Sequence, residues 1–170
     1  AYERLLGLRG LRLGEGDAPF LRDELEQQGE LPEVLVVELP LRRAGFRLPS
    51  WAQLCDLSAW AREHEVPLHF DGARLWEASA FYQRPLAEIA ALADSVYVSF
   101  YKGLGGLAGG ALAGPAPFLA QARPWITRMA GDVYTLFPYV LSARQGLRQH
   151  LPRLAHYRER ALGLAAALAQ

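Results

Sequence analysis

The chain has little cysteine and no excess charge of either sign. Its 170 residues include one cysteine and equal numbers of basic and acidic residues, 18 of each. A single cysteine, Cys55, cannot form an intrachain disulfide, which is typical of proteins in a reducing compartment. Without a basic excess there is no electrostatic footprint for nucleic acid or an anionic membrane. No apolar run approaches the ~20 residues of a membrane helix, and no secretory signal is visible. We therefore expect a cytoplasmic protein that binds neither nucleic acid nor membrane.

Lysine is also scarce. Of the 18 basic residues, all but Lys102 are arginines. Arginine does not deprotonate in proteins, whereas a lysine amine can act as a nucleophile and form a Schiff base. A sole lysine followed by the glycine-rich run GLGGLAGG suggests chemistry that only an amine performs. Two alternatives stay open: Lys102 could be a solvated cation on a loop, or a lysine that occurs by chance in an arginine-rich composition.

Strand-like and helix-like segments alternate along the chain. Apolar runs predict strands at 33–39, which has the look of a strand covered on both faces, and at 67–71 and 95–100, with helices at 48–67 and 84–94 between them. Ser50 and Gln53 form a capping box that should begin the first of these helices. The alternation predicts an α/β fold with a mainly parallel sheet and helices on both faces. A strand at 109–114 follows too short a connection for a parallel crossover, so it should be antiparallel.

Shorter signals flank this pattern. The residues at 8–16 are compatible with a short strand, and those at 19–28 with a short helix. Helices are also expected at 115–131 and 138–170. The chain begins at Ala1 rather than Met and ends in a helical pattern without a stop signal. We therefore expect a partial chain.

Two residues fall beyond strand ends, where open α/β sheets bind ligands. Asp71 heads the motif DGAR, which alone reads as a turn, with Arg74 capping a helix or pairing with Asp71. His69 shares a sheet face with Asp71 and either packs there or orients the Asp71 carboxylate. Lys102 follows the next strand. Pyridoxal phosphate requires a lysine that binds its aldehyde and, separately, a carboxylate that pairs with its ring nitrogen.

The motifs HFDGAR (69–74) and ADSVYVSFYKGLGGLAGGALAG (93–114) resemble the threonine aldolase and β-eliminating lyase family of fold-type I pyridoxal-phosphate enzymes. The resemblance runs from about residue 33 to residue 146 and indicates a divergent member. It implies that residues 1–137 are part of the large cofactor-binding domain. Residues 138–170 would be helices leading toward a small C-terminal domain that is absent.

The resemblance also implies roles for individual residues. Lys102 would form the Schiff base with pyridoxal 5'-phosphate, and Asp71 would pair with the pyridinium nitrogen, which makes these two the catalytic residues. Arg74 would sit near the phenolic oxygen or the substrate carboxylate. The remaining cofactor-binding positions that we expect are His69, Gly103 and Gly105, the glycines because the backbone must turn close under the cofactor. No metal ligand is expected.

The implied activity is that of a carbon–carbon lyase, an aldolase that cleaves a β-hydroxy amino acid to glycine and an aldehyde. The family implies a homodimer or homotetramer with sites built across the dimer interface, so the activity of this chain alone stays open. Its phosphate-binding loop and ring-stacking histidine cannot be located here.

Two tyrosines keep other functions open. Tyr101 stands where the family usually has Ser or Thr before the lysine. Tyr134 lies about where many aldolases have an arginine for the substrate carboxylate. β-Elimination, transamination and a catalytically incomplete α/β domain are therefore alternatives. A dinucleotide-binding loop fits less well, because GLGGLAGG leads into a strand rather than a helix.

Overall fold

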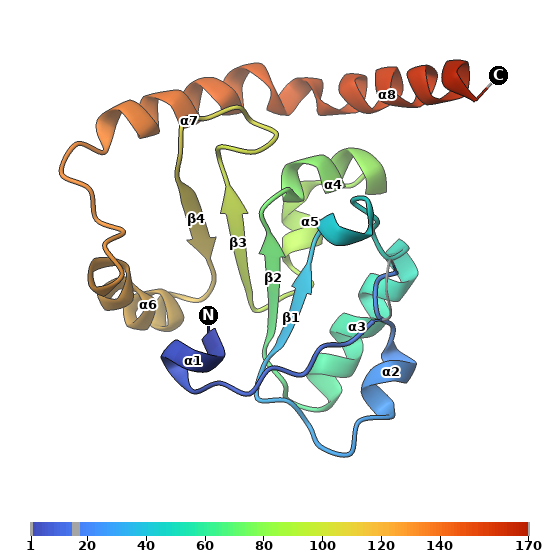
Figure 1. Cartoon of the computed structure of the whole chain (residues 1–170), viewed down its shortest axis with the longest axis vertical. Coiled ribbons are helices and arrows are strands. Elements are labelled where there is room, and N and C mark those ends of the chain that lie inside the picture. Colours follow the sequence, from blue (N-terminus) through green and yellow to red (C-terminus); the bar gives the residue numbers. More distant parts are fainter. Residues whose placement is uncertain (1, 15–17, 170) are drawn as a thin grey trace.

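One sheet of four strands forms the centre of the computed structural model, which describes residues 2–14 and 18–169 (Figure 1). The strands are β1 (Leu35–Glu38), β2 (Leu68–Gly72), β3 (Ser95–Ser99) and β4 (Gly110–Ala113). They are ordered β1-β2-β3-β4, the first three parallel and β4 antiparallel to β3. The predicted sheet, including its antiparallel last strand, is confirmed.

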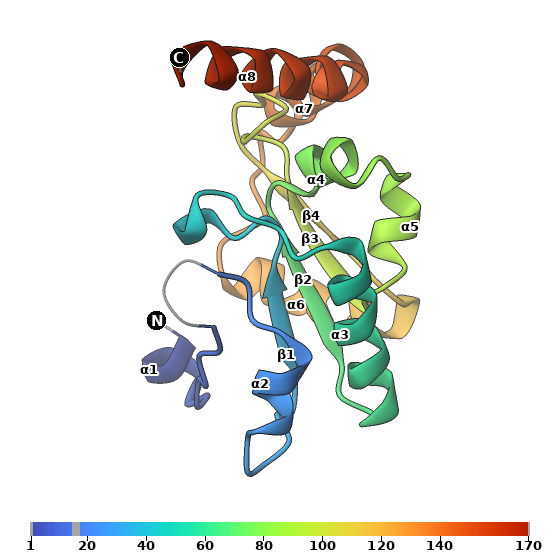
Figure 2. The same ribbon diagram turned by 90° about the vertical axis from the view of Figure 1, so that its right-hand side faces the viewer.

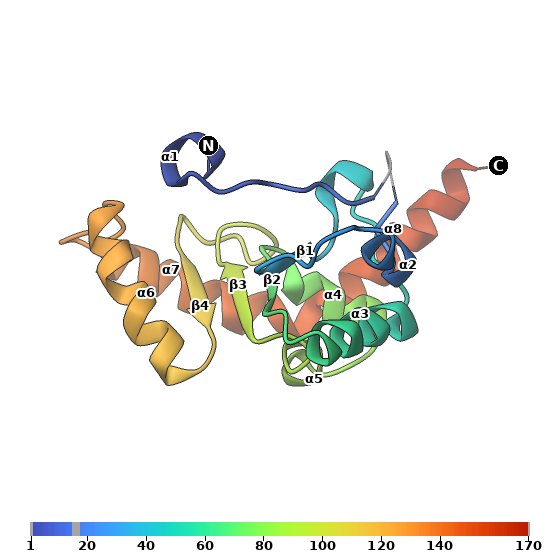
Figure 3. The same ribbon diagram turned by 90° about the horizontal axis from the view of Figure 1, so that it is seen from below.

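Helices flank the sheet. In two perpendicular views, α3 and α5 cover one face and α1 lies on the opposite side (Figures 2 and 3). Figure 1 shows α7 and α8 lying across the edge at which β1, β2 and β3 end. The helices are α1 (Tyr2–Leu6), α2 (Arg22–Glu26), α3 (Trp51–Glu63), α4 (Leu75–Tyr82), α5 (Leu86–Ala90), α6 (Ala116–Arg128), α7 (Phe137–Gln149) and α8 (Leu154–Leu168), with 3-10 turns η1 (Arg42–Ala44) and η2 (Leu151–Arg153).

The hydrophobic core lies between the sheet and α3. Because side chains alternate along a strand, only one side of each strand faces this core. Its largest fully buried members include Phe70, Leu54 and Trp60. The opposite face of β1 is different, since Val36 keeps 53% of its surface exposed. The expectation that this apolar strand is covered on both faces is therefore not met at Val36.

Local signals account well for the start of α3. The Ser50 hydroxyl accepts a hydrogen bond from the Gln53 N–H (3.2 Å), and the Gln53 side chain accepts one from the Ser50 N–H (2.8 Å). The predicted capping box is thus confirmed. No described helix is long and apolar enough to cross a membrane.

The N-terminal segment differs from its prediction. Residues 8–14 form no strand, and 15–17 lie outside the described residues. Two leucines of this segment stay exposed, Leu8 by 51% and Leu11 by 54%, whereas Leu13 is partly buried and packs against the core. The predicted short strand is therefore absent from the described part of this segment, since a strand needs a neighbour with which to pair its backbone.

Candidate active site at the carboxyl edge of the sheet

Asp71 is half-buried and lies near the end of β2, a strand with a neighbour on each side. In register it pairs with Glu38 of β1 and Tyr97 of β3. Its carboxylate accepts a hydrogen bond from the Ala73 N–H (3.3 Å), the turn expected for DGAR. Gly72 is required next to it, because a Cβ there would come within 2.8 Å of the Tyr97 carbonyl oxygen.

Lys102 lies on the loop that follows β3. Its side chain is half-buried, with Nζ 4.4 Å from the centroid of the Tyr101 ring. Because β2 and β3 are adjacent and parallel, their carboxyl ends meet at one edge of the sheet. Asp71 and Lys102 therefore belong to the same edge, as the sequence predicted.

The glycines after Lys102 fold the loop back on itself. The Gly105 N–H donates to the Lys102 carbonyl (2.9 Å), and Gly105 has φ +66°, a conformation that favours glycine. The Gly106 N–H donates to the Phe100 carbonyl (2.8 Å), and a Cβ on Gly106 would come within 2.6 Å of that oxygen. Gly105 thus forms a turn directly after Lys102, and Gly106, which was not singled out from the sequence, closes it.

Helix α4 supports both sides of the lysine, a feature that the sequence did not indicate. The Trp76 indole N–H donates to the Ser99 carbonyl (2.7 Å), before Lys102. After Lys102, the Glu77 carboxyl lies where a side chain on Gly103 would be, with its Cδ 2.6 Å from an ideal Cβ. Burial raises the pKa of Glu77, and the charge of Arg74 opposes this rise.

Helix α7 holds the same loop from another side. The Leu107 N–H donates to the Ser142 hydroxyl (2.9 Å), and Leu104 is fully buried. A Cβ on Gly146 would overlap the Leu104 carbonyl. The loop that carries Lys102 is thus fixed by two helices.

Arg74 and His69 lie at opposite ends of β2: Arg74 follows its carboxyl end, and His69 is near its amino end, away from the Lys102 loop. Arg74 occupies the N-cap position of α4, with its guanidinium carbon 4.8 Å from the centroid of the Phe46 ring. His69 is half-buried, with Nδ1 2.8 Å from the Ser95 hydroxyl. Burial lowers the pKa of His69, and the neighbouring charge of Asp71 opposes that shift.

Tyr97 adds a group that sequence reasoning missed. Its side chain shares the face of Asp71, because the two residues are cross-strand partners. Burial raises the pKa of Tyr97, and Tyr101 and the Asp71 carboxylate raise it further. Tyr101 therefore touches the site through Tyr97 as well as through Lys102.

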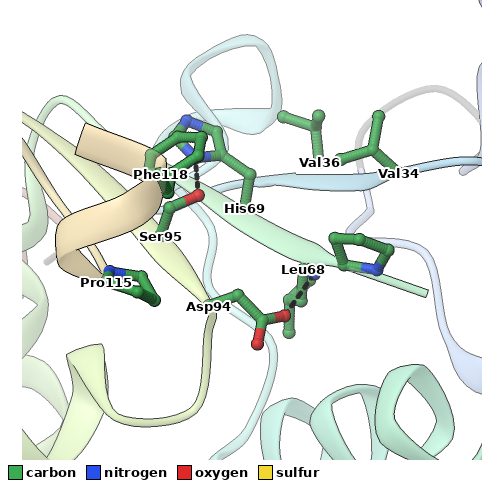
Figure 4. Close-up of a pocket in the computed structure, with 9 residues that line it drawn as sticks. Val34, Val36, Leu68, His69, Asp94, Ser95, Pro115 and Phe118 are labelled. Carbon is green, nitrogen blue, oxygen red and sulfur yellow. Dashed lines mark hydrogen bonds between the residues drawn. The ribbon is translucent and has the colours of Figure 1, made fainter. Parts of the chain in front are cut away.

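An apolar cavity of about 370 Å³ lies on the same sheet face but at the other end of the strands (Figure 4). It is lined by residues at the beginnings of β2 and β3 and by α6, among them Leu68, His69, Ser95 and Phe118. In open α/β sheets, ligands bind at the carboxyl ends. We therefore place the candidate active site at Asp71 and Lys102 rather than in this cavity.

The chemistry of the two central groups fits the cofactor expected from the sequence. A primary amine can hold an aldehyde covalently, and a carboxylate can hold the proton of a ring nitrogen. The loop glycines keep the turn that follows Lys102 tight. The donor set at this edge thus suits pyridoxal phosphate.

A family model described as "Beta-eliminating lyase" matches residues 9–170. A solved structure from Listeria monocytogenes, provisionally described as an L-allo-threonine aldolase, has a TM-score of 0.93 and 41% identity. That match covers 96% of this chain and 46% of the other. A protein from Exiguobacterium, provisionally described as an aromatic amino acid β-eliminating lyase/threonine aldolase, has a TM-score of 0.87 and 42% identity, covering 92% and 44%.

A curated relative extends the same likeness. Low-specificity L-threonine aldolase 1 of Arabidopsis thaliana is 34% identical over 110 residues, which are 65% of this chain and 31% of that protein. The chain therefore spans about a third of the Arabidopsis relative and less than half of the two solved structures.

Proposed function

Because the chain belongs to the β-eliminating lyase family, we propose that it carries part of the active site of a pyridoxal-phosphate-dependent lyase of the threonine-aldolase type. The substrate would be a β-hydroxy amino acid, cleaved to glycine and an aldehyde. One observation carries the proposal: the only lysine and the aspartate of DGAR stand at the ends of adjacent parallel strands.

The proposed roles follow from the chemistry of each side chain. Lys102 would hold the cofactor through a Schiff base, since its amine can be deprotonated. Asp71 would keep the proton on the pyridine nitrogen by charge attraction. Arg74 would attract the phenolic oxygen or the substrate carboxylate. His69, which contacts the Ser95 hydroxyl, would help to orient the Asp71 carboxylate.

The overall reaction breaks one carbon–carbon bond. The substrate hydroxyl loses its proton, the Cα–Cβ bond breaks, an aldehyde leaves and Cα gains a proton to give glycine. When bound, pyridoxal phosphate supplies an electron-accepting ring that stabilises negative charge at Cα. Asp71 would favour this charge delocalisation by holding the ring proton in place.

We further propose that the working protein is a homo-oligomer. Residues 1–137 would belong to its large domain, and 138–170 would lead toward a small one. The relatives are two to three times as long as the matched region, which supports this division into domains. The cofactor experiments below therefore use the intact protein that contains this chain.

The test is whether Lys102 becomes covalently linked to the cofactor. The intact protein is incubated with pyridoxal phosphate, scanned for the visible band of the lysine link, reduced with borohydride and digested. We expect the reduced adduct on the peptide that contains Lys102. Lys102→Arg keeps the charge but should lose both band and adduct. An adduct on another residue, or an unchanged band in Lys102→Arg, would overturn the assignment.

A second candidate is another reaction on the same cofactor, such as β-elimination or transamination. The observation in its favour is that Tyr101 and Tyr134 stand at positions where the sequence departs from the aldolase pattern. Aldehyde release from a β-hydroxy amino acid supports the aldolase. Release of ammonia with a keto acid supports β-elimination, and keto acid without ammonia supports transamination. A protein that forms no link with the cofactor would be the catalytically incomplete domain.

A further inference from the structure

Glu77 is a half-buried residue whose carboxyl group has no part in the proposed chemistry. Its Oε2 atom is buried and, among the described residues, has no hydrogen-bond partner. Leaving such an oxygen unsatisfied is costly, so an apolar residue of similar size would pack there with less penalty. The Glu77 carboxyl group should therefore have a role other than packing.

The position of the carboxyl group indicates that role. For an ideal Cβ at Gly103, the three nearest heavy atoms are all from the Glu77 carboxyl: Cδ, Oε1 and Oε2. Gly103 has no positive φ that would itself exclude a side chain. A side chain at the position after Lys102 would therefore have to displace the end of the Glu77 side chain, so the two residues form one contact.

Neighbouring contacts hold the lysine loop on both sides of the contact between Glu77 and Gly103. Trp76, the residue before Glu77, binds the Ser99 carbonyl on the other side of Lys102. The loop also closes through the Gly105 N–H to the Lys102 carbonyl. Helix α4 therefore contacts the chain three residues before the lysine and one residue after it.

On the basis of the proposed function, we propose that Glu77 is a positioning residue for Lys102. Its carboxyl group packs on Gly103 and fixes the turn from which the Lys102 amine reaches the cofactor. Glu77 itself touches neither cofactor nor substrate. The DGAR motif and the lysine loop are thus joined by a side chain three residues after Arg74.

The test uses three substitutions of Glu77 and Gly103 in the intact protein. The measurement is the pyridoxal phosphate concentration that gives half of the visible lysine-link band. Glu77→Ala should raise this concentration about tenfold or more, and Glu77→Gln, which keeps the shape, should stay within about twofold of wild type. Glu159→Ala, on an exposed face of α8, is the matched control and should change nothing.

Gly103→Ala tests the contact from the other side. The added Cβ displaces the Glu77 carboxyl, so this variant should also weaken the link. Combined with Glu77→Ala, it should cost no more than Glu77→Ala alone, because the carboxyl is no longer there to be displaced. Denaturant unfolding of every variant separates loss of positioning from loss of the fold.

Each result decides the proposal. A wild-type band in Glu77→Ala, additive effects of the two substitutions, or a Glu77→Gln variant as weak as Glu77→Ala would overturn it while leaving the proposed function intact. A wild-type protein without any band would overturn the proposed function, and the positioning role would fall with it.

Discussion

Helices α3 and α6 have the same length and opposite surroundings. Each has 13 residues. Five residues of α3 are buried, whereas none of α6 is. Trp60 of α3 is 1% exposed, and Trp125 of α6 is 50% exposed. The difference lies in the surface that each helix faces, because α3 packs on the sheet and α6 lies beside the edge strand β4 (Figure 3).

This comparison shows that apolar content does not by itself give burial. α6 contains Phe118, Trp125 and Ile126, yet these keep 39%, 50% and 46% of their surface. Hydrophobic stabilisation requires area removed from water. The free energy of folding of the described structure should therefore reside mainly on the α3 side, and four predictions test that division.

The largest effect should come from the α3 side of the sheet. Phe70 of β2 is fully buried. Phe70→Ala removes its contacts and leaves a cavity, so we expect a loss of about 3–5 kcal/mol in the free energy of unfolding. Denaturant titration followed by circular dichroism measures it. A loss below about 1 kcal/mol would mean that the core does not carry the stability.

The start of α3 should contribute the next effect. Ser50→Ala removes the hydroxyl that accepts the Gln53 N–H, which should cost about 1 kcal/mol. Ser50→Asp retains an acceptor and serves as control. An Asp variant as unstable as the Ala variant would contradict the capping explanation.

The open face should show a pH effect through His69. Its folded pKa lies below the unfolded value of 6.5, so the unfolded state binds more protons in acid. The stability contributed by neutral His69 is therefore complete above about pH 6.5 and decreases as the pH falls through the folded pKa. Unfolding of wild type and His69→Gln between pH 7 and 5 measures this, and the two curves should converge in acid. Parallel curves would argue against a buried neutral imidazole.

The smallest effect should come from α6. Because Trp125 is half exposed, Trp125→Ala should change the free energy of unfolding by no more than about 0.5 kcal/mol in this chain. The same denaturant titration used for Phe70→Ala applies. A cost comparable to that of Phe70→Ala would abolish the contrast between the two sides.

Local sequence signals predicted much of the fold. Ser50 with Gln53 marked a helix start, and a short connection after Lys102 required β4 to be antiparallel, because both depend on nearby residues. The edge with Asp71 and Lys102 followed from the alternation of strands and helices.

What escaped prediction depends on contacts between distant segments. Glu77 meets Gly103, 26 positions away (103 − 77), and no periodicity marks such a meeting. The turn at DGAR and a helix capped by Arg74 were among the alternatives, but the extent of α4 after them was not predicted. The exposure of Val36 could not be predicted either, since an apolar run does not tell which of its faces has a neighbour.

The contact of Gly146 with Leu104 has a consequence for engineering chimeric proteins. Glycine inside a helix is unfavourable by about 1 kcal/mol relative to alanine, yet here a larger residue would overlap a backbone oxygen. The lysine loop and α7 must therefore be transplanted as one unit. A crossover point near residue 137 would place a foreign helix against the lysine loop, and a residue larger than glycine at position 146 would overlap the Leu104 carbonyl. A crossover point beyond His150 would keep the lysine loop and α7 together.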